Sequence, residues 1–128
     1  MMFLDQILKE PARRYLLVNG RTGQVVAEHL ATAFDSTSRN KGLLGRQTFE
    51  QGHALIIAPS NAIHTWFMRF PIDVAYVRKN GQIIKTKNSL GPWRLSAALG
   101  VFAVIELPAG ALQASGTKSG DELALRPV

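Results

Sequence analysis

The sequence predicts an α+β domain that is mainly β. Three observations support this: short apolar runs recur along the chain, Asn-Gly pairs separate some of them, and no long helical pattern stands between them. We therefore expect a compact antiparallel sheet of about seven or eight short strands with a few short helices, because closely spaced strands curl into barrels or sandwiches. The sheet is expected to be barrel- or sandwich-like.

Length and composition indicate one domain over residues 1–128. The chain has 128 residues, of which 46% are apolar, and it contains no cysteine. A chain of this size buries a core without disulfides, and the lack of thiols excludes thiolate nucleophiles and thiolate metal sites. No run of about 20 apolar residues is present, so we expect a soluble cytoplasmic protein with no membrane association.

The charge balance points to anionic partners. The formal net charge is +6 and the pI is about 10.2. The basic residues are scattered, however, and the only adjacent pairs are Arg13-Arg14 and Arg78-Lys79. A polybasic run is absent, which favours a small anionic ligand over nucleic acid.

The first third of the chain contains a helix, a hairpin and a second helix. Residues 1–12 form an N-terminal helical extension, because Phe3 to Leu8 carry a helical apolar stripe that Pro11 stops. Residues 15–18 and 24–27 flank Asn19-Gly20 and predict a hairpin whose second strand continues to about Phe34.

A cluster of helix N-cap residues over 35–38 predicts a second helix, from about Ser38 to Gly45. Its periodicity places Arg39 and Arg46 near one face. Gly42 lies inside this helix, where glycine is unfavourable unless a backbone or a ligand approaches closely.

The central part predicts strands over 54–58, 63–68, 72–78 and 83–87, with Asn80-Gly81 as a hairpin turn between the last two. Residues 88–100 read as a loop with a short helix over 95–99. The C-terminal part predicts a strand over 101–107, a short helix over 108–114 and a final strand over 122–126.

The stretch His64 to Val77 is the most apolar and aromatic part of the chain, yet it contains ionisable residues. Strand alternation places His64 and Trp66 on one face, where the indole offers a stacking surface for a ligand. Our first hypothesis is a non-enzymatic binding module for a small anionic or polar ligand. The expected pocket has the loop Gly91–Trp93 as a lid and is lined by Arg39, Arg46, His64, Trp66 and Arg69.

Two buried carboxylates require an explanation. We expect Asp73 and Glu106, each set in an apolar strand, to form structural ion pairs with arginines. A second hypothesis is a small hydrolase or lyase in which His64 is the base and Asp73 orients it. A third is binding of nucleic acid or a protein partner through the basic surface.

No metal or cofactor is expected. The three histidines at positions 29, 53 and 64 have no short ligand spacing. The chain also lacks a Gly-x-Ser-x-Gly elbow, a Walker loop and a dinucleotide fingerprint. Since no nucleophile or metal constellation is visible, a binding module is favoured over an enzyme.

Several blocks resemble, in order, the uncharacterised bacterial and archaeal family known as domain of unknown function 192, over residues 31–125. Leu44 stands where that family has methionine, a mild change of volume. The resemblance implies a compact β-rich fold with a few small helices, and it brings no assigned activity or catalytic residue. The matching blocks are Arg39–Arg46, His64–Val74, Gly81–Ile84, Val104–Gly110 and Gly120-Asp121.

Overall fold

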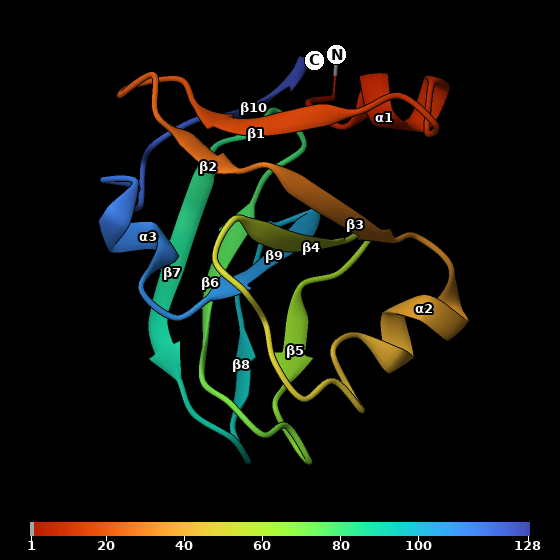
Figure 1. Ribbon diagram of the computed structural model, residues 1–128, viewed down its shortest axis with the longest axis vertical. Helices are drawn as coiled ribbons and strands as arrows, with labels where there is room; N and C mark the ends of the chain where they lie inside the picture. Colours follow the sequence, from red (N-terminus) through yellow and green to blue (C-terminus); the bar gives the residue numbers. More distant parts are fainter. Residues whose placement is uncertain (1) are drawn as a thin grey trace.

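The computed structural model describes residues 2–128, which form three helices and ten strands in three sheets (Figure 1). The helices are α1 (Asp5–Lys9), α2 (Ser36–Lys41) and α3 (Ala111–Ala114). The five-stranded sheet has the order β3 (His29–Ala33), β4 (His53–Ile57), β9 (Ala103–Pro108), β6 (Ile72–Val77) and β7 (Ile83–Leu90). The three-stranded sheet has the order β10 (Leu123–Pro127), β1 (Tyr15–Asn19) and β2 (Val25–Ala27), and β5 (Ala62–His64) pairs with β8 (Leu95–Ala97).

The five-stranded sheet is the centre of the molecule. Every residue of β6 and β9 is buried, because both faces of these strands are covered. One face, which includes Ala75 and Ile105, packs against β1, β10 and α1 and contacts Leu17 of β1 in a shared core. The other face includes Val74 and Val104 and is covered by the segments around α2 and β5. The predicted α+β, mainly β class is confirmed as a sandwich-like arrangement; its sheets stay open, so "barrel" does not describe it.

One strand pair is parallel, unlike the antiparallel pairing expected throughout. The chain leaves β2 and enters β3, which runs parallel to β4 from the His29/His53 pair to the Ala33/Ile57 pair. Residues 34–52 lie between these strands and include α2, which gives the crossover length that a parallel pair requires. The second strand of the first hairpin therefore does not continue to Phe34.

The helix α2 is shorter than predicted and begins earlier. Its N-cap is Asp35, whose carboxylate accepts a hydrogen bond of 2.7 Å from the backbone N–H of Ser38. It ends at Gly42, where φ is +48°, a value that glycine tolerates better than other residues. The glycine expected inside the helix instead terminates it.

The strand predicted over 63–68 ends at His64, and the helix predicted over 95–99 is strand β8. Thr65 Oγ1 donates to the carbonyl of Gly91 at 2.6 Å and accepts from the backbone N–H of Arg94 at 2.9 Å. These bonds join two loops, and Phe67 turns the first with a φ of +64°. Pairing with a neighbouring strand therefore overrides the local helical preference after residue 94.

Both predicted hairpins are present. β1 pairs antiparallel with β2, and β6 pairs antiparallel with β7. In the second hairpin, Gly81 has a φ of +94° and the Asn80 side chain accepts a 3.0 Å hydrogen bond from the backbone N–H of Gln82. No helix within residues 2–128 is both long and apolar enough to cross a bilayer.

Candidate functional site

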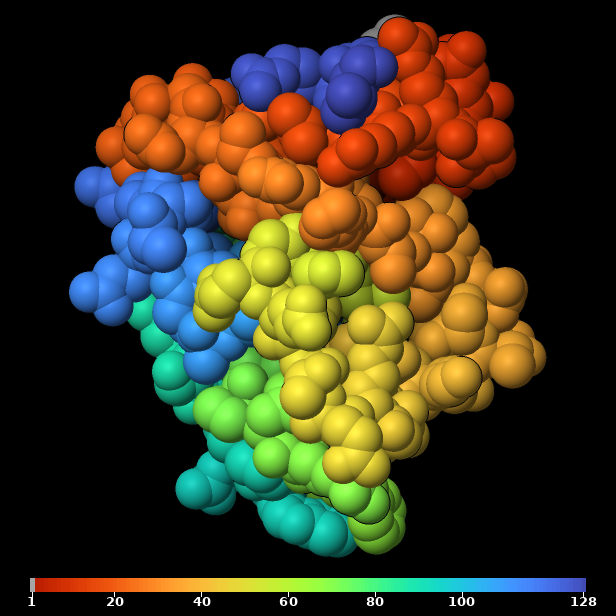
Figure 2. All heavy atoms as spheres, in the orientation of Figure 1, coloured from red at the N-terminus to blue at the C-terminus, as the bar shows by residue number. Residues whose placement is uncertain are grey.

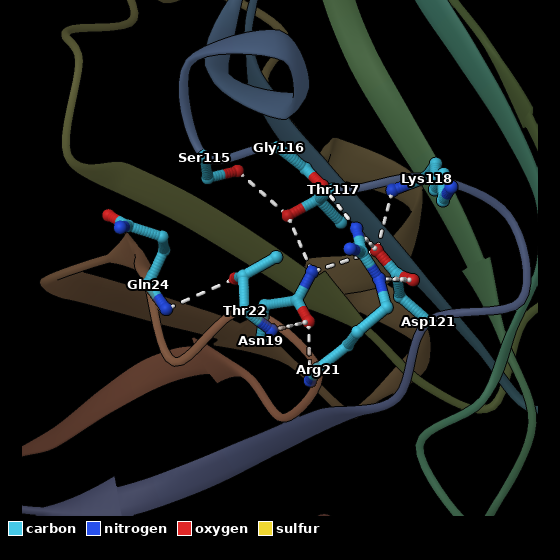
Figure 3. Close-up of polar contacts among 9 residues, drawn as sticks. All are labelled: Asn19, Arg21, Thr22, Gln24, Ser115, Gly116, Thr117, Lys118 and Asp121. Atoms are coloured by element: carbon cyan, nitrogen blue, oxygen red, sulfur yellow. Dashed lines mark hydrogen bonds and ion pairs between the residues drawn. The ribbon is translucent and has the colours of Figure 1, made fainter.

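The densest polar network joins the first hairpin to the segment before β10 (Figure 3). Arg21 donates to both carboxylate oxygens of Asp121, at 2.6 and 3.0 Å, and Asn19 donates to the same carboxylate at 2.9 Å. The backbone N–H of Lys118 adds a further bond of 2.9 Å. The pKa of Asp121 lies well below its usual range, chiefly because Arg21 stabilises the charged form. The carboxylate is fully satisfied by internal partners, so this network holds the fold together.

Asp73 also has a structural role, although its partners are not arginines. Its carboxylate accepts hydrogen bonds from the backbone N–H groups of Ser89 at 2.8 Å, Gly110 at 3.1 Å and Leu112 at 3.0 Å. No cation of residues 2–128 forms a salt bridge with it. The predicted Asp73 ion pair is therefore wrong: three backbone amides at the start of α3 and in β7 satisfy the buried charge.

The arrangement required for His64 to work with Asp73 is not formed. Asp73 lies on the face of β6 that it shares with Ala75 and contacts Leu112 of the first core. Its neighbour Val74 points to the opposite face, toward the core that contains Ile63. The sheet therefore stands between Asp73 and the segment that carries His64, and the second hypothesis loses its orienting carboxylate.

Glu106 lies on that opposite face and has no partner. It is opposite Val74 in the β6–β9 pairing and is 4% exposed. Among residues 2–128 its carboxylate takes part in no salt bridge, so the predicted ion pair is wrong here too. Arg39 donates to the backbone carbonyl of Phe34 at 2.8 Å and not to Glu106. The carboxylate has no hydrogen-bond donor within the described part of the chain and keeps slight solvent contact, so water or a ligand can supply the donor.

The environment of Glu106 favours its protonated form. Burial raises its pKa to about 7, and the nearby charge of Arg46 opposes this only in part. Burial also raises the pKa of the Tyr76 hydroxyl, and the nearby charge of Glu106 adds to the rise. The Tyr76 and Ser96 hydroxyls are buried and have no hydrogen-bond partner within residues 2–128. Two unsatisfied hydroxyls thus lie in the same half of the core as Glu106.

A cavity of about 380 Å³ opens beside Glu106, and we call it the Glu106 pocket. Figure 2 shows the segment that follows α2, in yellow, spread over the middle of the visible face, and this segment supplies one wall. The volume is within the range of small-molecule sites. The lining residues are Arg39, Asn40, Lys41, Gly42, Leu43, Leu44, Ile57, Ser60, Ala62, Ile63, His64, Met68 and Glu106.

The predicted site residues separate into two groups. Arg39 and His64 line the Glu106 pocket, whereas Arg46 lines a neighbouring hollow of about 390 Å³. Trp66 is half-exposed and stacks on His64 with ring centroids 4.9 Å apart, but it does not line the pocket. Arg69 is exposed and donates to the side chain of Gln47 at 3.2 Å. The loop expected as a lid, Gly91–Trp93, is outside the lining as well.

Sequence reasoning missed Lys41 and the role of Glu106 in the pocket. A signal for the second was present, because a lone carboxylate in an apolar strand requires either a cation or a ligand. The arrangement that results is a cavity with a protonatable acid in its wall, two cations on α2 and an imidazole on β5. It can accept a hydrogen bond at Glu106 and hold an acidic group near the cations.

A larger hollow of about 500 Å³ lies between α1 and β3. Its basic residues include Arg13, Arg14 and the stacked pair His29 and His53, whose ring centroids are 4.8 Å apart. The Tyr15 hydroxyl there already donates to backbone carbonyls. Among the described residues that line this hollow no carboxyl or hydroxyl is both buried and unpaired, so we place the candidate site at Glu106.

Comparisons with known proteins agree on the fold. A crystal structure from Sinorhizobium meliloti 1021, described as a "putative transcription regulator", matches with a TM-score of 0.76 and 21% identity over 88% of this chain and 92% of that one. A protein of unknown function from Novosphingobium aromaticivorans DSM 12444 matches with a TM-score of 0.74 and 21% identity over 86% of this chain and 82% of that one. No curated protein matches the sequence.

The family model agrees with the blocks quoted from the sequence. It matches residues 17–125, which include the first hairpin, the wall of the Glu106 pocket and the start of β10. The match extends the resemblance expected over residues 31–125 toward the N-terminus. Because it covers most of the chain, the chain belongs to the DUF192 family, described as an uncharacterized ACR.

Proposed function

We propose that this protein is a binding module for a small polar ligand that occupies the Glu106 pocket. The observation that carries the proposal is the Glu106 carboxylate, which is 4% exposed, has no partner among the described residues and borders a cavity. A ligand that donates a hydrogen bond to this carboxylate would supply the partner that the protein itself does not provide.

The charges around the pocket define the ligand further. Arg39 and Lys41 on α2 bring positive charge to the pocket wall, His64 on β5 adds an imidazole, and Glu106 on β9 can accept a hydrogen bond. Ile57, Ile63 and Met68 supply the apolar remainder. A molecule with an amino or hydroxyl donor at one end and a carboxylate or phosphate at the other matches this distribution.

A thermal-shift screen with small amino acids, hydroxy acids and phosphorylated polyols tests the proposal. We expect a compound that raises the melting temperature of the wild type and leaves that of Glu106→Gln and Arg39→Ala unchanged. Glu122→Gln and Arg126→Ala serve as matched controls, because both positions are exposed in or beside β10, away from the pocket. A shift that survives in Glu106→Gln would contradict the proposal.

Acid–base catalysis is the second candidate function, and the pKa of Glu106 favours it. A carboxyl group with a pKa of about 7 is suited to proton transfer at neutral pH, and His64 lines the same pocket. This reading replaces Asp73 by Glu106 as the working carboxylate. It predicts turnover of the bound compound, with a bell-shaped pH profile that both Glu106→Gln and His64→Ala abolish.

A further inference from the structure

The connections between β5 and β6 and between β7 and β8 lie at the end of the molecule away from the two termini (Figure 1). A group of exposed apolar side chains belongs to these connections and to the start of β8. It comprises Trp66, Phe67, Trp93 and Leu95, and we call it the aromatic tip. Their exposed fractions are 46, 70, 59 and 72%. Single exposed apolar residues are normal on a protein surface, whereas a contiguous group of large ones marks an interaction site.

The two loops that form the aromatic tip are joined by hydrogen bonds. The backbone of Thr65 donates to the carbonyl of Arg94 at 2.8 Å and accepts from the N–H of Trp93 at 3.1 Å. The side chain of Thr65 adds two further bonds to the same loop, including the one to Gly91 at 2.6 Å. The rings of Phe67 and Trp93 meet edge to face with centroids 4.7 Å apart. Two loops are thus fixed together with their aromatic side chains outward.

Two of the tip residues adopt a backbone conformation that aromatic residues avoid. Phe67 has a φ of +64° and Trp93 a φ of +63°. Glycine or asparagine would occupy these turns with less strain. Backbone strain of this kind clusters at binding and functional sites, so the strained backbone under two exposed aromatic residues favours a role for their side chains.

The charge around the aromatic tip is positive. Arg69 and Arg94 are exposed within two residues of Phe67 and Trp93, respectively. Between residues 60 and 100 the only acidic residue is Asp73, which is 1% exposed and bonded to backbone amides. The surface that accompanies the exposed rings therefore attracts anions.

We propose that the aromatic tip docks on the surface of a lipid bilayer that contains anionic lipids. Tryptophan prefers the headgroup region of membranes, and neighbouring arginines pair with acidic headgroups. Phe67 and Leu95 are the most exposed members of the tip and would enter the acyl boundary. This proposal is independent of the Glu106 pocket, and it replaces the expectation that the protein has no membrane association.

The shape and composition of the tip favour a bilayer over other anionic partners. Proteins bind single-stranded nucleic acid by stacking bases on free aromatic faces. Leu95 has no ring, and the rings of Phe67 and Trp93 contact each other edge to face, so the tip is poorly suited to stacking a row of bases. None of the three cavities described above is lined by a tip residue, whereas helix- and strand-binding domains hold their peptides in grooves. An outward tip of apolar rings with a basic flank suits a soft planar surface.

The chain provides its own reporter for the test. It has two tryptophans, and both belong to the aromatic tip, so emission excited selectively from tryptophan arises there. We expect the emission to shift to shorter wavelength, and the protein to sediment, with vesicles of phosphatidylcholine and phosphatidylglycerol. Vesicles of phosphatidylcholine alone should bind at least tenfold more weakly, and salt should weaken binding to the anionic vesicles.

Matched variants separate docking from general charge and stability effects. Leu95→Ser should weaken vesicle binding at least tenfold, while Leu8→Ser on α1, at the opposite end of the molecule, should not (Figure 1). Arg94→Glu should act likewise, while Arg78→Glu, with the same change in net charge, should have a small effect. Phe67→Gly removes a ring at a position that glycine tolerates, so it should abolish the wavelength shift and keep the fold.

Three results would overturn the proposal. The first is no sedimentation with anionic vesicles at low salt. The second is equal loss of binding in Leu95→Ser and Leu8→Ser. The third is a change in tryptophan emission that vesicles do not cause but that a single-stranded oligonucleotide or self-association does cause. This change would also have to be absent in Phe67→Gly.

Discussion

Arg21 donates hydrogen bonds to both carboxylate oxygens of Asp121 and thereby ties the first hairpin to the segment before β10. The two residues are 100 positions apart in the chain. Their contact helps to hold the three-stranded sheet in register, because Asn19 at the end of β1 donates to the same carboxylate. The first testable prediction follows from this contact.

Asp121→Ala should lower the free energy of unfolding by about 2 to 4 kcal/mol at pH 7, because several charge-assisted hydrogen bonds are lost together. The depressed pKa of Asp121 means that this stabilisation is present above about pH 4, the ordinary pKa of aspartate, and is lost as the pH falls further. Urea unfolding at pH 7 and pH 3 measures both effects. Glu122→Ala, a change at the adjacent exposed acid, should stay within about 0.5 kcal/mol of the wild type.

Glu106 should affect the free energy of unfolding with the opposite pH dependence, and Glu106→Gln should remove this effect. The pKa of Glu106 is raised from 4.5 to about 7 in the folded protein, so the unfolded state ionises first as the pH rises. Stability is therefore lost between about pH 4.5 and pH 7, by about 3 kcal/mol from this group.

The glutamine variant cannot ionise at this position. We expect it to be more stable than the wild type at pH 8 and closest to it at pH 4.5. Thermal or urea unfolding across this range measures the difference between the two proteins. A difference that does not change between pH 4.5 and pH 8 would show that Glu106 keeps an ordinary pKa.

Gly81→Ala should destabilise the protein by about 2 to 4 kcal/mol. The residue has a φ of +94°, and an added Cβ would collide with the backbone carbonyl of Leu123. Gly91→Ala is the matched control, because its backbone is not in the positive-φ region and no atom lies within 4 Å of the added Cβ. Equal denaturation midpoints for the two variants would contradict the structure of this turn.

Asp73→Ala should cost about 3 kcal/mol of stability, because three backbone N–H groups lose their acceptor, and Asp73→Asn should cost less. Neither change should alter the affinity of a ligand of the Glu106 pocket once the variant is folded. Ligand titration at a temperature well below the melting point checks this. If folded Asp73→Asn bound the ligand more weakly than the wild type, Asp73 would have to contribute to ligand binding.

Local sequence signals predicted the elements whose cause is local. The Asn-Gly pairs specified both hairpins, and the N-cap cluster marked the start of α2 within a few residues. The parallel β3–β4 pair was missed, since pairing direction depends on where the chain returns after a crossover and not on the residues of either strand. The early end of β5 was missed for a similar reason, because Thr65 bonds to a loop 26 residues away.

The candidate site could be predicted only in part. Of the five residues expected to line one pocket, Arg39 and His64 line the Glu106 pocket and the other three do not. Both carboxylates were expected in ion pairs, and neither forms one among residues 2–128. Asp73 and Glu106 look alike in the sequence, each a single acid in an apolar strand. Their surroundings differ because β6 and β9 direct these two side chains to opposite faces, one toward backbone donors and the other toward a cavity.

This division of the central sheet has a consequence for protein engineering. The side that holds Asp73 carries the hydrogen bonds that keep three segments together, and the side that holds Glu106 faces the pocket. The donors to Asp73 are backbone amides of Ser89, Gly110 and Leu112, none of which belongs to α2 or β5. The wall of the Glu106 pocket can therefore be redesigned residue by residue without touching the bonds on the other side.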